Sequence, residues 1–467
     1  MLVNTRLPSL PLKAGLRWAS ASAAKAPPEV KASPPRGSSR SGQNIVIVDG
    51  VRTPFCQSGT AYKSLYPHDL VKAAILGLLH RTKVPVEEID YVSMGTVIQE
   101  VKTANVAREG ALLAGIPLSV PCHTVTMACI SANQAITSSI GLINSGAAEV
   151  AIAGGVETMS DVPIRIGRRL RQTLLDLNKA KGLGKRLSLL GNFANPKNWA
   201  LELPAIAEFS SNETMGQSGD RLAAAFNISR REQDEFALRS HTLAQKAFQD
   251  GNLTDITPTF VPGQNRPVKQ DNGVRVSTLE KLGQLKPAFI RPHGTVTAGN
   301  ASYLTDGASA SLIMSEEKAK QLGLKPLAYL REFVYVAQDP KDQLLLGPAY
   351  ATPAVLQRAG LKLSDISVFE YHEAFAGQLL ANLKAMDSDW FAQNYMSRSS
   401  KVGTIPIEKL NSWGGSVSIG HPFGATGVRL VMHAANRLHK ENGQYAVVAA
   451  CAAGGHGHAM VVERYPK

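Results

Sequence analysis

Two stretches of the chain repeat one pattern, and this repeat limits the possible folds more than any other feature. Residues 148–157, AEVAIAGGVE, parallel residues 444–455, QYAVVAACAAGG, and both read as buried strands that end in a glycine pair. Earlier in each half, residues 79–92 and 356–369 share a helix end, a short turn and a strand. Strands alternate with helices around both copies. We therefore predict an α/β fold of two doubly wound halves with mainly parallel strands.

The longest uncharged stretch predicts a buried central helix. Residues 111–148 contain no Asp, Glu, Lys or Arg, but Pro117, Pro121 and many polar residues interrupt any apolar helix of membrane-spanning length. The part from residue 131 to about residue 144 is lined with small side chains, which suits a helix that is buried on all sides. Residues 424–438 look like its partner in the second half. We expect these two central helices to lie between two sheets.

A long segment without a counterpart in the second half interrupts the repeat. We predict an inserted, largely helical loop domain, and the domain boundaries are an N-terminal half at 43–163 completed by 292–328, the insertion at 164–291 and a C-terminal half at 329–467. Within and just before the insertion, nine basic residues face three acidic ones between residues 161 and 203. This segment and the N-terminal tail carry nearly all of the net charge of +13, so the charge does not predict a nucleic-acid partner.

The start of the insertion predicts a basic amphipathic helix. At about 100° per residue, Ile166, Leu170, Leu174, Leu177 and Ala180 share one stripe, and basic residues spread over the rest. The helix should stop near Gly182, and a second arm should follow it as a short hairpin. We expect contact with a membrane surface through Arg168, Arg169, Arg171, Leu170, Leu174 and Leu177. Two alternatives stay open: the stripe docks on the protein body or a partner subunit, or the cations attract coenzyme A.

The first 42 residues have the composition of a mitochondrial transit peptide. They contain seven Lys or Arg, many Ser and Ala, and a single acidic residue, Glu29. The alternative is a plain disordered tail. The four cysteines form no CxxC pair and no cluster at metal spacing, which predicts neither a disulfide framework nor a metal site and favours a reducing compartment.

One cysteine lies where a nucleophile could be activated. Cys129, in HTVTMACISANQAI, falls between a β-branched run and the predicted central helix. A helix N-terminus lowers the pKa of a nearby thiol, although an inert buried cysteine is the competing interpretation. Three more stretches end strands or open helices at equivalent places of the repeat: SIGHPFGATG with His421, AACAAGGHG with Cys451, and EYHEAFAG with His372.

Taken together and in this order, with GTVTAGNASYLTDGASA at residues 294–310, these motifs resemble those of the thiolases over nearly the whole chain after the tail. The resemblance implies the thiolase fold, with duplicated halves in αβαβα layers. It also implies that Cys129 is the acylated nucleophile, that His421 activates it, and that Cys451 is the acid and base at the α-carbon of acetyl-CoA. Related condensing enzymes lack the second cysteine. The resemblance further implies an oxyanion site from the backbone N–H groups of Cys129 and Ala453, and pantetheine contact by Ser302.

Two residues depart from the usual thiolase pattern. His372 stands where an asparagine normally holds an oxyanion water; an imidazole N–H can also donate to that water, and we expect its charge to depend on pH. His456 stands where glutamine is commoner. With His372 in this motif and with its basic insertion, the chain is most similar to a mitochondrial branch of the family that assembles with a hydratase/dehydrogenase α subunit.

From this resemblance we expect a mitochondrial long-chain 3-ketoacyl-CoA thiolase of fatty acid β-oxidation, on the matrix side of the inner membrane. The expected partners are acyl-CoA and coenzyme A as substrates, a second copy in a homodimer core, and the α subunit; no cofactor, metal or nucleic acid is expected. Two alternatives remain: a biosynthetic acetoacetyl-CoA thiolase, and a non-catalytic scaffold that binds lipid or RNA. Intact Cys129, His421 and Cys451 argue against the scaffold.

Overall fold

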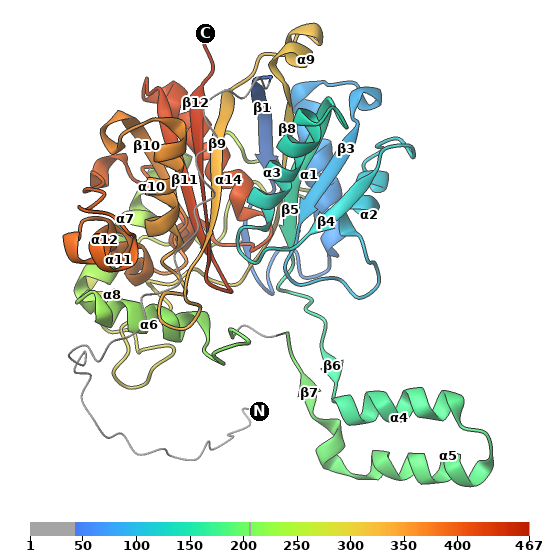
Figure 1. Cartoon of the computed structure of the whole chain (residues 1–467). Coiled ribbons are helices and arrows are strands. Elements are labelled where there is room, and N and C mark those ends of the chain that lie inside the picture. Colours follow the sequence, from blue (N-terminus) through green and yellow to red (C-terminus); the bar gives the residue numbers. More distant parts are fainter. Residues whose placement is uncertain (1–42, 205–206, 467) are drawn as a thin grey trace. The chain divides into compact units, whose positions relative to one another are not determined.

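The structure, a computed structural model, describes residues 43–204 and 207–466, so the predicted transit peptide at residues 1–42 lies outside the described residues. One mixed sheet runs through both halves (Figure 1). Its order is β10-β11-β12-β9-β1-β8-β5-β3-β4. The bounds are β1 Ile45–Arg52, β3 Tyr91–Gly95, β4 Cys122–Val125, β5 Val150–Glu157, β8 Thr305–Ser315, β9 Ala328–Ala337, β10 Ile366–Tyr371, β11 Tyr445–Ala452 and β12 His456–Arg464.

The two halves meet through a short antiparallel pairing between β1 and β9. Val46 pairs with Tyr329 and Ile47 with Ala328. We expected two separate sheets, and this pairing joins them into one hydrogen-bonded path. Val46 and Ile47 in β1 are fully buried.

Only part of each half is parallel, which corrects the sequence prediction. β3 runs parallel to β4 and β5, and β10 runs parallel to β11, but β8 is antiparallel to β1 and β5, and β12 is antiparallel to β11 and β9. The link from β11 to β12 explains the second case. Gly454 and Gly455 have φ values of 83° and 70°, a left-handed conformation that suits a tight reversal, whereas parallel strands need a long crossover.

Helices form three layers around this sheet, in agreement with the predicted αβαβα arrangement. The central pair is α3 (Ser131–Asn144) and α14 (Thr426–Lys440), which contact each other and the inner faces of both halves. Helices α1 (Pro67–Thr82) and α2 (Val106–Leu113) cover the outer face of the first half. Helices α10 (Gly347–Ala359) and α11 (Ala376–Met386) cover that of the second (Figure 1). Both central helices fall close to the predicted ranges.

The inserted segment begins with the predicted helical hairpin. Short strands β6 (Arg165–Ile166) and β7 (Leu201–Glu202) pair at its base, and α4 (Arg168–Lys179) packs against α5 (Leu183–Leu190) (Figure 1). Helices α6 (Met215–Ala225), α7 (Arg230–Gln249) and α8 (Leu279–Gly283) follow. In the described part of the chain, no helix combines the length and apolar character needed to cross a bilayer.

Burial within the hairpin corrects part of the predicted membrane contact. Leu170 is fully buried and Leu177 is half-buried, because the second arm and the turns after it cover this side of α4. Arg171 bonds to Glu202 and to the carbonyl of Ile166. The exposed apolar side chains of the hairpin are Leu174, Leu175, Leu183, Leu187 and Leu190.

The remaining elements are short. They are β2 (Cys56–Gln57), α9 (Glu316–Gln321), α12 (Asp389–Tyr395), α13 (Ser416–Ile419) and the 3-10 turns Val86–Glu88, Gly191–Ala194, Pro196–Trp199, Leu363–Asp365 and Ile407–Lys409. Of these, α13 matters most for the site, because it leads directly into the turn that carries His421.

Candidate active site

Cys129 lies in a tight turn between β4 and α3. Ala128 before it has a φ of 45°, which is unusual for a residue with a side chain. The turn is held by hydrogen bonds from the N–H of Ser131 to the carbonyl of Ala128 (3.0 Å) and from the N–H of Met127 to the hydroxyl of Ser131 (2.8 Å). A backbone held in a sparsely populated conformation is common at functional sites. It presents the thiol at the start of the helix, as the sequence predicted.

The thiol is nevertheless not acidic in the free protein. Burial raises the pKa of Cys129 to about 12, although hydrogen bonds from the backbone N–H of Ala453 and from its own N–H favour the thiolate. This corrects the expected lowering by the helix dipole, because desolvation outweighs it. A neighbouring base must therefore take the proton as the nucleophile attacks.

Cys451 reaches the same place from the second half. It lies near the end of β11 beside the turn into β12, and it is almost completely buried. Burial, and next the proximity of Cys129, raise the pKa of its thiol. Ala453, two residues later, directs its N–H toward the Cys129 sulfur. The structure therefore brings together the two cysteines and the two backbone N–H groups that the sequence predicted.

A neighbouring hydroxyl determines which ring nitrogen of His421 carries the proton. The hydroxyl of Thr426 donates to the carbonyl of Pro422 (2.9 Å) and lies 2.7 Å from Nδ1 of His421. Since that hydroxyl has one proton, it must accept from Nδ1–H, which leaves Nε2 of the neutral ring as an acceptor. Burial, the neighbouring His372 and Arg429 hold the pKa of His421 well below its usual range. Nε2 is buried and has no hydrogen-bond partner among the described residues, so it is available as a base.

His372 faces His421 across the site. It follows β10, its backbone N–H bonds to the carbonyl of Ala449 (2.8 Å), and its ring centroid lies 4.0 Å from that of His421. Burial and Arg429 lower the pKa of His372 to about 3. The expectation that its charge changes with pH is therefore wrong near neutrality: the ring is uncharged there.

Ser302 lies between the two histidine motifs. Its neighbour Ala301 forms a bridge with Phe375, Leu304 forms one with His421, and the Ser302 hydroxyl donates to the carbonyl of Ala374 (2.9 Å). Ser302 is partly exposed, so it borders the site. Its contact with pantetheine stays a prediction.

The sequence analysis missed Glu157, which clamps the site from the end of β5. Its carboxylate accepts from the N–H groups of Val97 (3.1 Å), Ile98 (2.9 Å) and Gly424 (3.0 Å). Burial raises its pKa to about 7. Two residues earlier, a Cβ on Gly155 would lie 1.8 Å from the carbonyl oxygen of Gly424. An acidic residue in an otherwise apolar strand was the signal that could have revealed this clamp.

Glu373 supports the motif that carries His372. Its carboxylate accepts from Asn411 (2.7 Å), from the hydroxyl of Ser240 on α7 (2.8 Å) and from the N–H of Val417 (3.2 Å). A Cβ on Gly415 would collide with this carboxylate. Glu373 therefore ties the inserted segment and α13 to the loop that carries His372.

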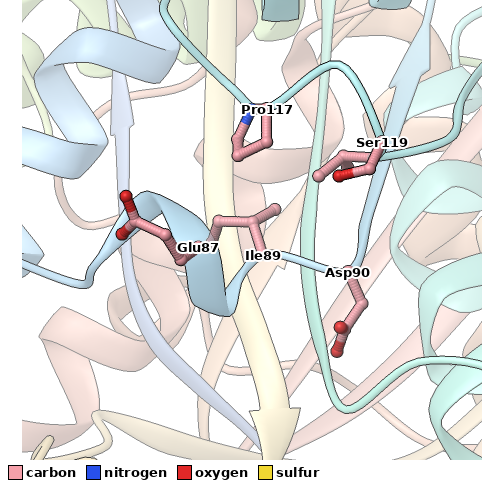
Figure 2. A pocket seen from close by; sticks show the side chains of 6 residues that line it. Glu87, Ile89, Asp90, Pro117 and Ser119 are labelled. Carbon is pink, nitrogen blue, oxygen red and sulfur yellow. The ribbon is translucent and has the colours of Figure 1, made fainter.

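A separate surface pocket is not part of this site. Figure 2 shows it at the start of β3, lined by Glu87, Ile89, Asp90, Pro117, Ser119 and Val120. Its two carboxylates do not favour a phosphorylated ligand such as coenzyme A. In the described part of the chain, no group of three or more His, Cys, Asp or Glu side chains is arranged to hold a metal ion.

Comparison with known proteins gives one consistent result. Residues 45–317 match the family model described as "Thiolase, N-terminal domain", and residues 324–464 match "Thiolase, C-terminal domain". The chain is 67% identical over 429 residues to "Trifunctional enzyme subunit beta, mitochondrial" of Bos taurus, which covers 91% of this chain and 89% of the relative.

Two solved structures are similar as well. A Bacillus anthracis acetyl-CoA acetyltransferase has a TM-score of 0.78 at 34% identity, and human mitochondrial 3-ketoacyl-CoA thiolase has a TM-score of 0.77 at 31% identity. Each match covers 91% of this chain and 99% of the other.

Proposed function

The chain belongs to the thiolase family, and from this premise we propose that it cleaves long-chain 3-ketoacyl-CoA with coenzyme A, giving acetyl-CoA and an acyl-CoA two carbons shorter. The observation that carries the proposal is the meeting of Cys129 and Cys451 beside the Ala453 N–H, to which the paired neutral imidazoles of His372 and His421 add. A fatty acid is degraded by repeating this step, so the expected setting is β-oxidation.

The first half of the reaction forms an acyl-enzyme. Nε2 of His421 takes the proton of Cys129 as the sulfur attacks the keto carbon C3, and the C3 oxygen becomes an alkoxide. The backbone N–H groups of Cys129 and Ala453 stabilise that charge. Collapse of the alkoxide breaks the C2–C3 bond and leaves the shortened acyl group on Cys129.

Cys451 acts on the acetyl-CoA fragment as it leaves. The C2–C3 electron pair leaves as the enolate of acetyl-CoA, and Cys451 protonates its carbon; the high pKa of this buried thiol keeps it protonated until then. The enolate oxygen faces the side of His372 and His421. The thiol of coenzyme A then gives its proton to the thiolate of Cys451, and its sulfur attacks the thioester carbonyl on Cys129. The bond between the acyl group and Cys129 breaks, the departing thiolate takes its proton back from His421, and the product acyl-CoA is released.

Substrate length separates this proposal from a biosynthetic acetoacetyl-CoA thiolase. The test is thiolysis of 3-ketohexadecanoyl-CoA and acetoacetyl-CoA by the purified chain, with coenzyme A present or omitted. We expect a higher kcat/KM for the long substrate. A preference for acetoacetyl-CoA favours the biosynthetic alternative, and inactivity with both favours the non-catalytic scaffold.

The relatives support a proposal for the location and partners of the chain. The Bos taurus relative is named a mitochondrial β subunit of a trifunctional enzyme, and this supports a mitochondrial chain that assembles with a hydratase/dehydrogenase α subunit. A homodimer core is supported by β4, a strand at the end of the sheet order with partly exposed residues Cys122–Val125. Co-expression with the α subunit and light scattering test both contacts.

The helical hairpin supports contact with the matrix side of the inner membrane. The same hairpin exposes five leucines and the cations Arg168 and Arg169, a combination suited to an anionic lipid surface. Leu170 is buried and Arg171 pairs with Glu202 within the inserted segment, so this surface differs from the one predicted from the sequence. A hydrophilic coenzyme A site needs no such row of exposed leucines.

A further inference from the structure

A buried serine hydroxyl connects His372 to an arginine. Ser416, the first residue of α13, is fully buried, and its Oγ lies 3.0 Å from Nδ1 of His372. From the opposite side, Nη2 of Arg429 on α14 donates to the same Oγ at 2.9 Å. All three side chains are fully buried, and within residues 43–204 and 207–466 Nε2 of His372 has no hydrogen-bond partner.

The proton count at Ser416 decides the form of the imidazole. The guanidinium of Arg429 has only N–H groups, so the serine oxygen must accept there. The single hydroxyl proton of Ser416 is then free to point at Nδ1 of His372. A neutral imidazole that accepts at Nδ1 carries its proton on Nε2.

We propose that Ser416 and Arg429 are positioning residues that fix His372 as a neutral Nε2–H donor, opposite the Nε2 acceptor of His421. This inference rests on the proposed thiolase function and refines its second oxyanion site. The two histidines are set to opposite forms by two different hydroxyls, Ser416 for one and Thr426 for the other. An oxygen between them accepts from His372, and a water there also donates to His421.

Charge near the ring acts in the same direction. Arg429 from α14 and His421 from the turn after α13 bear on His372, while Glu370 on β10 lies 3.8 Å from Nη1 of Arg429 and the buried Glu373 also bears on that guanidinium. The cation disfavours protonation of His372, and Glu370 keeps that cation in place. The competing explanation is structural: Ser416 merely fills the space between α13 and α14.

Two backgrounds separate these explanations. Ser416→Ala should lower kcat on a 3-ketoacyl-CoA by about tenfold or more with little change in KM, because the ring then loses its fixed tautomer. The same change in a His372→Asn background should have almost no further effect, because an amide needs no partner at Nδ1. Ser418→Ala is the matched control: Ser418 is also buried on α13, but it bonds to Gly415 and Ser240.

The results have distinct meanings. Equal losses in both backgrounds, or a loss in the Ser418 control as large as that in Ser416→Ala, would show a structural role and overturn the proposal. Nitrogen-15 NMR of histidine-labelled protein reads the tautomer without any activity, with the His372 signals assigned by their loss in His372→Asn. A protonated Nε2 supports the proposal and a protonated Nδ1 overturns it. An inactive wild type with a protonated Nε2 would refute the thiolase function but leave the tautomer assignment intact.

Discussion

The rings of His372 and His421 lie 4.0 Å apart, centroid to centroid, with their planes inclined by 43°. They come from different motifs, one after β10 and one after α13. Both are completely or almost completely buried, and in the part of the chain that the structure describes neither Nε2 has a hydrogen-bond partner. Two imidazoles this close cannot both be charged, and burial keeps both rings neutral until, in the proposed reaction, His421 takes the proton of Cys129. This histidine pair and the meeting of Cys129 with Cys451 together define the chemistry of the site.

Cys129→Ala should abolish thiolysis, with a loss of at least about a thousandfold in kcat, because no other group can carry the acyl chain. The methyl is smaller than the thiol, so the fold should remain. Mass spectrometry of the wild type mixed with substrate should find the acyl group on Cys129. An adduct on Cys451 or Cys122 instead would reverse the assigned roles.

His372→Asn should keep turnover within about tenfold of the wild type, since either side chain donates a hydrogen bond to an oxyanion or its water. The measurement is kcat for both proteins across a range of pH. A loss of several orders of magnitude would mean that His372 acts as an essential base, in conflict with its assignment as a donor.

The buried His372 should also affect stability at low pH. Its pKa is about 3 in the folded protein and near 6.5 when unfolded, so the unfolded chain binds the extra proton between these values. The contribution of the neutral His372 ring to the free energy of unfolding is present above pH 6.5 and is lost as the pH falls. Between pH 7.5 and 5.5 the wild type should lose about 1 kcal/mol more than His372→Asn. Denaturant unfolding at the two pH values measures this, and equal losses would contradict the buried neutral ring.

Arg168→Glu combined with Arg169→Glu should weaken co-sedimentation with cardiolipin-containing liposomes at low salt and spare thiolysis of a short substrate. The matched control reverses the same number of charges on α7, with Arg231→Glu and Lys246→Glu, both exposed residues. Unchanged binding in the hairpin variant would argue against membrane contact. An equal loss of short-substrate activity would favour a coenzyme A site.

Sequence patterns predicted the layers and the residues of the site, because glycine pairs, motif order and apolar periodicity are local features. They did not predict the antiparallel course of β8, which depends on where the chain returns after a long insertion, or that of β12, which reverses through the Gly454–Gly455 turn. They also misjudged Cys129 and His372, whose pKa values are set by burial from several elements at once. Leu170 was misplaced for a similar reason: periodicity identifies an apolar stripe but not what covers it.

The close approach of Gly155 to the Gly424 carbonyl limits how the two halves of the chain can evolve. One glycine ends a strand of the first repeat copy and the other lies in the histidine turn of the second, with no space for even a methyl group between them. After duplication, neither copy could therefore change its backbone at this point without a matching change in the other. Recombination that exchanges only residues 329–467 between distant relatives joins surfaces that have not evolved together, so the two halves persist as a co-adapted pair and not as interchangeable modules.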